Sequence, residues 1–402
     1  MSLTRVCSVG LYLVALVLLA SACTSSSGNF SQYPGFDEWY AANPPVTHGP
    51  TEAEQTLLAR FQPRLFIAKD SGRPISFYED YIAHGRLFGS NGQIISDAVD
   101  QSTLNTVADD PGAVFVHHPS ESTTNKPSAV ARIDRESLPA IEAFAERPLI
   151  FLTYHYVFAT SGVAAGIRSW QRFFINLFAD TSDWHQLDHY TAVSVILDET
   201  SQQPIALMLQ QHNYLRTWIL TAETGPGRTQ LPPDGRVSVV AARDSNELFL
   251  RRDDQPFRRA VPMMTSENVR WLVMGQGRPI VTADDLTSAD TEVAASLRFL
   301  PPSDAFFTFK GWLGERRITP GRDGPPGADF NTWPDMMPRA RQLARFWWHE
   351  NDQDYVDLVE SGSERGATEL APYWRRLHRA LPPPVTTDQA ETQDLTRRAP
   401  SS

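Results

Sequence analysis

The sequence Asp183-Trp-His-Gln-Leu-Asp-His-Tyr190 leads directly into the apolar run Thr191-Ala-Val-Ser-Val-Ile-Leu197. The valines and isoleucine of that run predict a buried β-strand. The imidazoles and carboxylates that precede it suit a divalent metal from zinc to manganese, whereas calcium or magnesium would rely on the aspartates. The stretch therefore predicts either a metal or ligand site at a strand end, or a polar turn that caps the strand with His189 as a hydrogen-bonded core residue.

The rest of the chain reads mainly as strands with some helices. Further strands are predicted at Arg64–Ala68, Ala113–His117, Ile150–Phe158, Ile205–Leu209 and Val237–Ala242. Helices are predicted at Thr51–Phe61, Leu138–Glu146, Pro338–Glu350 and Pro372–Leu381. The segment 213–218 is predicted as loop, and 304–309 as loop with local strand. Both faces of 150–158 are apolar, which is typical of a central sandwich strand. The predicted fold class is mainly β with α decoration (α+β): a β-sandwich core plus a mixed C-terminal region.

Strand periodicity constrains the candidate site. If the strand extends back to Asp188, His189 lies on the opposite face, beside Val193 and Val195. His185 and Asp188 can share a site only if residues 184–187 form a turn. His212 follows the strand 205–209 and approaches His185 if the two strands pair. A second group of residues is expected to contact a ligand at the same end of the sandwich: Asp183, His189 and Trp218.

The N-terminus reads as a secretion signal. Residues 1–22 contain a short basic start and the apolar run 11–20, too short for a comfortable membrane span. The segment Leu19-Ala-Ser-Ala-Cys23 resembles the lipobox of bacterial lipoproteins, in which the cysteine is lipidated; the alternative is an ordinary signal with an incidental cysteine. The sequence has two cysteines, and the other one, Cys7, lies inside the signal. Because no cysteine follows Cys23, the remaining chain can form no disulfide and no thiolate metal site. Residue 24 is threonine rather than aspartate, which favours the outer over the inner membrane in a Gram-negative cell.

The chain divides by composition into five predicted parts. These are a signal peptide (1–22), a lipidated N-terminus and linker (23–50), a β-sandwich domain (51–260), a mixed α/β region packed on the core (261–381) and a disordered tail (382–402).

Charge and motifs exclude several function classes. The net charge of −11 argues against a nucleic-acid partner, because such proteins normally present a basic face. The sequence contains no Gly-x-Ser-x-Gly elbow, no His-Glu-x-x-His, no phosphate-binding glycine loop and no dinucleotide fingerprint.

The order of the segments resembles the Vps62-like family. The segments that carry the resemblance are Phe61–Phe66, Ile75–Ile82, Phe151–Phe158, Asp188–Val195, Leu209–Trp218 and Val239–Asn246. The same plan is similar to that of the necrosis- and ethylene-inducing-like proteins, which are β-sandwich cytotoxins. Their Gly-His-Arg-His-Asp-Trp-Glu heptad is similar in spacing to Trp184–Tyr190.

The resemblance implies a divalent-cation site that is degraded here. His185 matches the first histidine of the heptad, Asp188 its aspartate and His212 a downstream histidine. Tyr190 replaces the glutamate, Leu187 replaces the second histidine, and Asn246 stands where Vps62-like chains commonly have histidine. The activity of the cytotoxins is therefore not transferred to this chain.

Three functions are compatible with these patterns. The first is a lipid-anchored envelope protein that is not an enzyme, whose sandwich binds a glycolipid, a carbohydrate or an envelope protein, with a structural divalent cation as an option. The second is a metal-dependent hydrolase that uses His185, Asp188 and His212 at the cell envelope. The third is a cytotoxin-like effector, which the loss of a ligand at Tyr190 and the retention by a lipid anchor disfavour.

Overall fold

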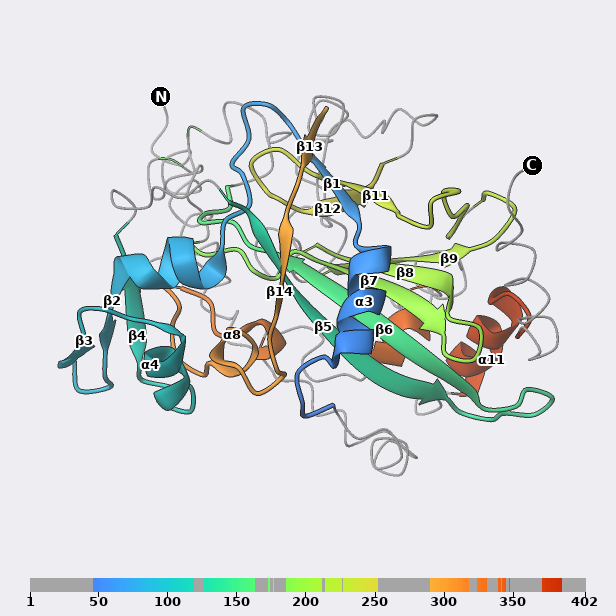
Figure 1. The fold of residues 1–402 in the computed structure, drawn as a ribbon, viewed down its shortest axis with the longest axis horizontal. Coiled ribbons are helices and arrows are strands. Elements are labelled where there is room, and N and C mark those ends of the chain that lie inside the picture. Colours follow the sequence, from blue (N-terminus) through green and yellow to red (C-terminus); the bar gives the residue numbers. More distant parts are fainter. Residues whose placement is uncertain are drawn as a thin grey trace, which may run out of the picture.

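The computed structural model describes residues 46–118, 126–162, 173, 176, 186–211, 214–225, 227–251, 290–317, 324–330, 339–340, 342–344, 347 and 371–384 (Figure 1). The predicted signal peptide, Cys23 and most of the predicted C-terminal tail lie outside these residues.

A seven-stranded sheet forms the centre of the molecule. Its strands, in spatial order, are β10 (Arg228–Thr229), β9 (Tyr214–Leu220), β8 (Gln203–Gln211), β7 (Ala192–Asp198), β6 (Arg147–Tyr156), β5 (Ser128–Leu138) and β14 (Ser296–Phe299). The five strands from β5 to β9 are antiparallel neighbours, and the short strands β10 and β14 extend the two edges in parallel. The predicted strands 150–158 and 205–209 thus lie next to the strand that follows Asp183–Tyr190 (Figure 1).

A second sheet covers one face of the first. It contains β12 (Leu248–Leu250), β11 (Ser238–Ala241), β1 (Arg64–Ile67) and β13 (Thr291–Val293). Alternate residues of β5 to β8 pack with Leu65, Val239 and Leu248 in one buried cluster. Helix α3 (Glu52–Phe61) adds Leu58 and Phe61 to this core, and a Thr51 capping box begins the helix.

Helical segments cover the opposite face of the seven-stranded sheet. At one end, Phe151, Ile196 and Met208 pack against helix α11 (Ala371–Ala380) and against Ala340, Leu343 and Ala344. At the other end, helix α8 (Ala305–Thr308) packs its Phe306 and Phe307 into a separate aromatic cluster. The fold is mainly β with α decoration, as the sequence predicts.

A small third sheet lies beside the aromatic cluster. It consists of β3 (Ile94–Ser96), β2 (Gly85–Phe88) and β4 (Val114–His117). A π-helix (Phe77–Tyr81), a 3-10 turn (Ile82–His84) and helix α4 (Gln101–Thr106) connect and support this sheet, and a second 3-10 turn (Ala328–Phe330) follows α8. No helix among the described residues is long and apolar enough to span a membrane.

Three predictions of local structure are wrong. Residues 138–146 are not a helix: Leu138 ends β5, and a tight turn with Glu142 at φ 48° closes onto the Ile141–Phe144 bridge. Residues 214–218 are not a loop but belong to β9, which pairs along β8. Residues 305–308 form the short helix α8, which Asp304 begins by accepting a hydrogen bond from the backbone of Phe306.

Residues on both sides of position 260, where the sequence predicts a domain boundary, build the two large sheets. Strand β13 pairs with β1 in the four-stranded sheet, and β14 pairs with β5 in the seven-stranded sheet. The segment after residue 290 therefore supplies an edge strand to each sheet.

Candidate functional site

Asp188 is held at the end of the sandwich by a short backbone bridge. Its N–H donates to the carbonyl of Phe158 at 2.9 Å, and the N–H of Phe158 donates back at 2.8 Å. The regular pairing of β6 with β7 begins at His155 and Ala192. Between these two points the register changes by one residue, so the side chains before and after the irregularity alternate in opposite phase.

This irregularity decides which face Asp188 and His189 each occupy. Asp188 faces the second sheet, as its partner Phe158 does, whereas His189 lies on the opposite face. The predicted separation is confirmed. The placement of His189 beside Val193 is wrong, because Val193 points into the core between the sheets and the strand does not continue regularly back to His189.

His189 is enclosed by aromatic rings. Its imidazole has no solvent exposure and lies 4.4 Å from the Tyr190 ring and 5.5 Å from the Phe306 ring, centroid to centroid. Neither of its ring nitrogens makes a hydrogen bond of ordinary geometry. Burial lowers the pKa of His189 to about 3; the neighbouring His155 adds to the shift and the Pro326 carbonyl opposes it. His189 is therefore neutral at physiological pH.

The carboxylate of Asp188 accepts hydrogen bonds from two side chains. Oδ1 accepts from the Thr191 hydroxyl at 2.8 Å, and Oδ2 accepts from Nδ2 of Asn246 at 3.1 Å. The same amide of Asn246 donates to the carbonyl of Thr160 at 2.9 Å. Asp188 is only 2% exposed, so these bonds compensate a buried carboxylate. The contact joins the seven-stranded sheet to the loop that follows β11.

A strained turn presents Asn246 to Asp188. Asp244 and Asn246 adopt φ values of 65° and 58°, the left-handed region that asparagine and aspartate tolerate better than most residues. The turn closes where the N–H of Asn246 donates to the carbonyl of Ala242 at 3.0 Å. The next residue, Glu247, has no solvent exposure, and one of its carboxylate oxygens accepts from the Ser245 hydroxyl at 3.1 Å. The sequence pattern does not single out Glu247.

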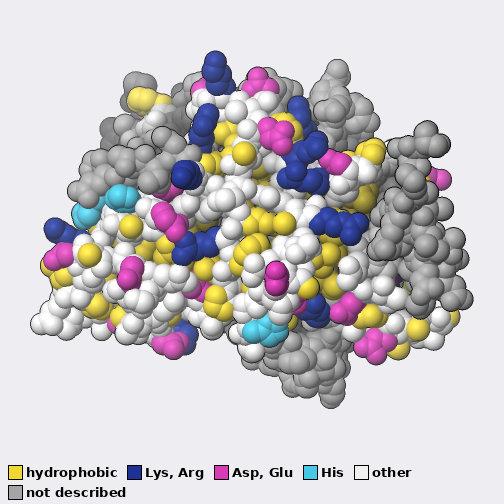
Figure 2. All heavy atoms as spheres, viewed as in Figure 1, with side chains coloured by type: hydrophobic (Ala, Val, Ile, Leu, Met, Phe, Trp, Pro, Cys, Tyr) yellow, Lys and Arg dark blue, Asp and Glu magenta, His cyan; other side chains and the backbone are white. Residues whose placement is uncertain are grey.

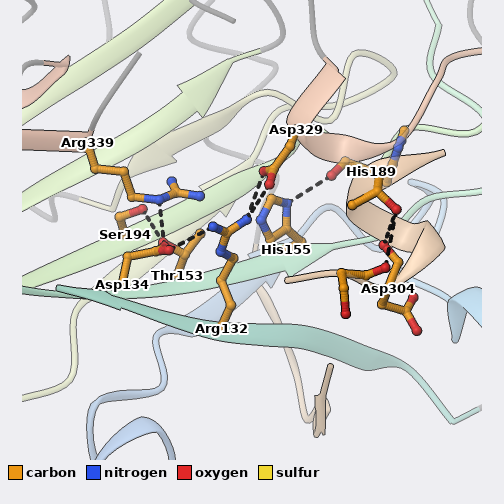
Figure 3. Close-up of polar contacts among 11 residues, drawn as sticks. Arg132, Asp134, Thr153, His155, His189, Ser194, Asp304, Asp329 and Arg339 are labelled. Atoms are coloured by element: carbon orange, nitrogen blue, oxygen red, sulfur yellow. Dashed lines mark hydrogen bonds and ion pairs between the residues drawn. The ribbon is translucent and has the colours of Figure 1, made fainter. Parts of the chain in front are cut away.

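A row of polar side chains crosses the opposite face of the seven-stranded sheet (Figure 3). Arg132, Thr153 and Ser194 are paired across β5, β6 and β7, and the hydroxyls of Thr153 and Ser194 lie 2.8 Å apart. In the neighbouring row, the Nδ1–H of His155 donates to the backbone carbonyl of His189 at 3.1 Å. Burial, with Arg339 adding to it, lowers the pKa of His155 to about 3, so this imidazole is also neutral.

Arg132 is the centre of a buried ion network (Figure 3). Its guanidinium donates to both carboxylate oxygens of Asp329 at 2.8 and 2.7 Å and to Asp134 at 2.7 Å. Arg339 donates to the second oxygen of Asp134 at 2.8 Å. Burial opposes the charge of Arg132, but the two carboxylates outweigh it and raise the pKa of Arg132. The network fixes the C-terminal region to the sheet.

The structure places three of the predicted site residues, Asp188, His189 and Trp218. Trp218 lies on β9, half-buried against the core between the two large sheets, with the Arg216 guanidinium 5.9 Å from its ring centroid. The predicted lipidation site and the other predicted ligands lie outside the described residues: Cys23, Asp183, His185 and His212. Within the described residues, no group of three or more His, Cys, Asp or Glu side chains could hold a metal ion. The metal site at His185, Asp188 and His212 stays a prediction.

Comparison with known protein families gives no match, and no curated protein is similar in sequence. A solved structure shows a distant likeness: the crystal structure of Necrosis and Ethylene inducing Protein 2 from the causal agent of cocoa's Witches Broom disease. The match covers 52% of this chain and 71% of that protein, with 15% sequence identity and a TM-score of 0.24. A similarity of this size does not support the transfer of residues or activity.

Proposed function

We propose that the protein is a lipid-anchored lipoprotein of the bacterial cell envelope whose β-rich body binds a ligand or partner and is not an enzyme. The observation that favours binding over catalysis is the environment of the Asp188 carboxylate. Both of its carboxylate oxygens accept hydrogen bonds from protein side chains, and the residue is buried. A general base or a metal-activating carboxylate instead needs access to the reacting group. The carboxylate of Asp188 instead connects the two large sheets through its hydrogen bond from Asn246.

The two described histidines near this end of the sandwich support the same proposal. His155 and His189 are buried among Phe306 and Phe307, and burial keeps both imidazoles neutral. A catalytic histidine normally titrates near the working pH. We expect the ligand to be a glycolipid, a carbohydrate or an envelope protein, and to bind where residues 183–190 meet the loop around Asn246.

The proposed anchor depends on Cys23 and on the small residues before it. Diacylation of this cysteine would hold the mature chain on a membrane by burying acyl methylenes in the bilayer. Thr24 after the cysteine favours the outer membrane in a Gram-negative cell.

The test of the anchor compares two cysteine variants of the full chain in its bacterial host. Cys23→Ser should move the protein from the membrane fraction to the soluble envelope fraction. Cys7→Ser, which lies in the signal segment, is the matched control and should leave the protein in the membrane fraction. Mass spectrometry of the N-terminal peptide should show acyl chains on Cys23 in the Cys7→Ser protein. Persistence of the Cys23→Ser protein in the membrane fraction would contradict the proposal that a lipid on Cys23 anchors the protein.

The test of the binding role measures retention of purified protein on immobilised envelope glycans, glycolipids and envelope extracts. Specific, saturable retention is expected. The same preparation should show no metal-dependent hydrolysis of these materials, and hydrolysis that chelator abolishes would favour the hydrolase.

A further inference from the structure

The hairpin of β2 and β3 carries an unusual pair of exposed side chains. Ile94 is 53% exposed and Ile95 is 45% exposed, and β3 is the edge strand of the three-stranded sheet. Consecutive strand residues point to opposite faces. Both faces of this edge strand therefore present an isoleucine to solvent, next to a polar turn that exposes Ser90, Asn91 and Gln93. The hairpin lies at one extremity of the molecule (Figure 1).

The turn at the end of the hairpin satisfies much of its own backbone. The N–H of Gly89 donates to the carbonyl of Gln93, and the N–H of Gly92 donates to the carbonyl of Gly89, both at 2.9 Å. The side chain of Asn91 accepts from the N–H of Gln93 at 3.0 Å, and Gly92 adopts the φ of 76° that the turn requires. Internal pairing lowers the cost of moving a backbone from water into a lipid interface.

The hairpin is also free of charge. Residues 87–96 contain no ionisable side chain, whereas the whole chain has a net charge of −11. Arg86 and Asp97, which flank this segment in the sequence, are exposed and form an ion pair of 3.1 Å at the base of the hairpin, and Asp110 lies close to Ser90 of its turn. Exposed acidic and basic side chains are spread over the rest of the visible surface (Figure 2). Because residues 87–96 carry no charge, their transfer to a bilayer interface takes no ionised side chain out of water.

We propose that the β2–β3 hairpin inserts Ile94 and Ile95 into the interfacial region of the membrane that carries the protein. The inference rests on the lipid anchor at Cys23. A lipid surface fits better than a protein partner, because a protein groove would cover one face of the strand and leave the other isoleucine in water. A bilayer surrounds a projecting hairpin and covers both faces.

The anchor brings the hairpin to the membrane, and the hairpin sets the orientation of the body. Two half-exposed isoleucines are too few to hold an unanchored protein, so the hairpin acts through the high local concentration that the anchor provides. Residues 24–45 separate Cys23 from Val46, and an extended chain of that length spans roughly 75 Å. That reach does not fix which surface of the body meets the bilayer, and the apolar hairpin supplies the preference.

The experiment uses the absence of other cysteines from the mature chain. In lipidated full-length protein, Cys23 is blocked, so Ile94→Cys introduces a single reactive thiol for an environment-sensitive fluorophore. The labelled protein is reconstituted into vesicles of phosphatidylethanolamine and phosphatidylglycerol that contain nitroxide lipids. We expect the fluorophore at position 94 to emit at a shorter wavelength in the vesicles than in buffer without lipid or detergent. We also expect the nitroxide lipids to quench its emission. Ile95→Cys should behave in the same way.

Glu223→Cys is the matched control, because this exposed residue comes three positions after the end of β9. Strand β9 lies on the opposite side of the view from β3 (Figure 1). We expect several-fold weaker quenching there than at position 94. Equal, water-like emission at both positions would overturn the inference, and acylated Cys23 in the same sample would show that the anchor is intact. A change at position 94 that needs no vesicles and grows with protein concentration would also overturn it, by identifying a second copy of the chain as the occupant.

Discussion

The side-chain amide of Asn246 donates a 3.1 Å hydrogen bond to the buried carboxylate of Asp188, and this contact joins the two large sheets at one end of the sandwich. Asp188 precedes β7 in the seven-stranded sheet, whereas Asn246 lies in the turn between β11 and β12 of the four-stranded sheet. This hydrogen bond fixes the ends of the two sheets relative to each other, and these are the ends that would form a ligand site.

Replacement of Asp188 should destabilise the protein strongly. Asp188→Ala removes the acceptor for both Thr191 and Asn246 and leaves two buried donors without their partner. Unsatisfied buried donors of this kind cost about 1–3 kcal/mol each, so we expect the free energy of unfolding to fall by about 2–4 kcal/mol. Urea unfolding followed by circular dichroism measures the difference. Asp97→Ala, which removes an exposed ion pair with Arg86, is the control and should change stability little. Equal effects of the two substitutions would contradict the structural role of Asp188.

The sequence predicts the elements whose apolar pattern is local. Short runs that are apolar on both faces and rich in β-branched or aromatic residues identify β6 and β7, and Thr51 followed by Glu54 identifies the start of α3. Strand β5 escapes prediction because it buries Arg132 and Asp134, which read as surface residues. Their burial depends on Asp329 and Arg339, about two hundred positions later in the chain.

The candidate site is predictable to a similar degree. Strand periodicity correctly places Asp188 and His189 on opposite faces. It cannot indicate which core His189 enters, because the register changes by one residue between Asp188 and Ala192. It also cannot predict the Asn246 contact, which depends on a turn with positive φ in another sheet.

Chelation separates binding from metal-dependent hydrolysis. If the body binds its ligand without a metal, tag-free purified protein should contain no stoichiometric divalent metal, and chelator should leave its melting temperature unchanged. A stoichiometric metal that is lost in His185→Ala and His212→Ala would instead support the hydrolase, because those residues with Asp188 form the predicted ligand set. Elemental analysis and thermal unfolding with and without chelator measure both outcomes.

His189 should make the protein sensitive to acid. Its pKa is lowered to about 3 in the folded state, whereas an unfolded histidine titrates near 6.5. The unfolded state therefore binds more protons between these values, and the stability contributed by the neutral imidazole is lost as the pH falls from about 6.5 towards 3. His155 adds a loss of the same sign.

Replacement of His189 by phenylalanine should reduce this sensitivity. The ring sits among Phe77, Tyr190 and Phe306, so an apolar aromatic side chain keeps the packing and removes two buried nitrogens. We expect His189→Phe to unfold at a higher urea concentration than the wild type at pH 5, with a smaller advantage at pH 7.5. A wild-type pH profile that the substitution does not flatten would refute the assignment.

Arg132 should be the most costly single side chain to remove from the polar network. Arg132→Ala leaves the buried carboxylate of Asp134 with Arg339 as its one remaining ion-pair partner among the described residues. It also removes the guanidinium nitrogen that donates to both oxygens of Asp329. Breaking a buried ion pair costs about 3–5 kcal/mol, because the charge left behind stays desolvated. Because Asp329 and Arg339 belong to the C-terminal region, we also expect faster proteolysis of that region than of the central sheet. Arg64→Ala removes a half-exposed ion pair with Asp234 and is the matched control, with an expected cost of about 0–1 kcal/mol. Urea titration and limited proteolysis with mass spectrometry measure these effects, and similar losses in the two variants would show that the network does not hold the C-terminal region to the sheet.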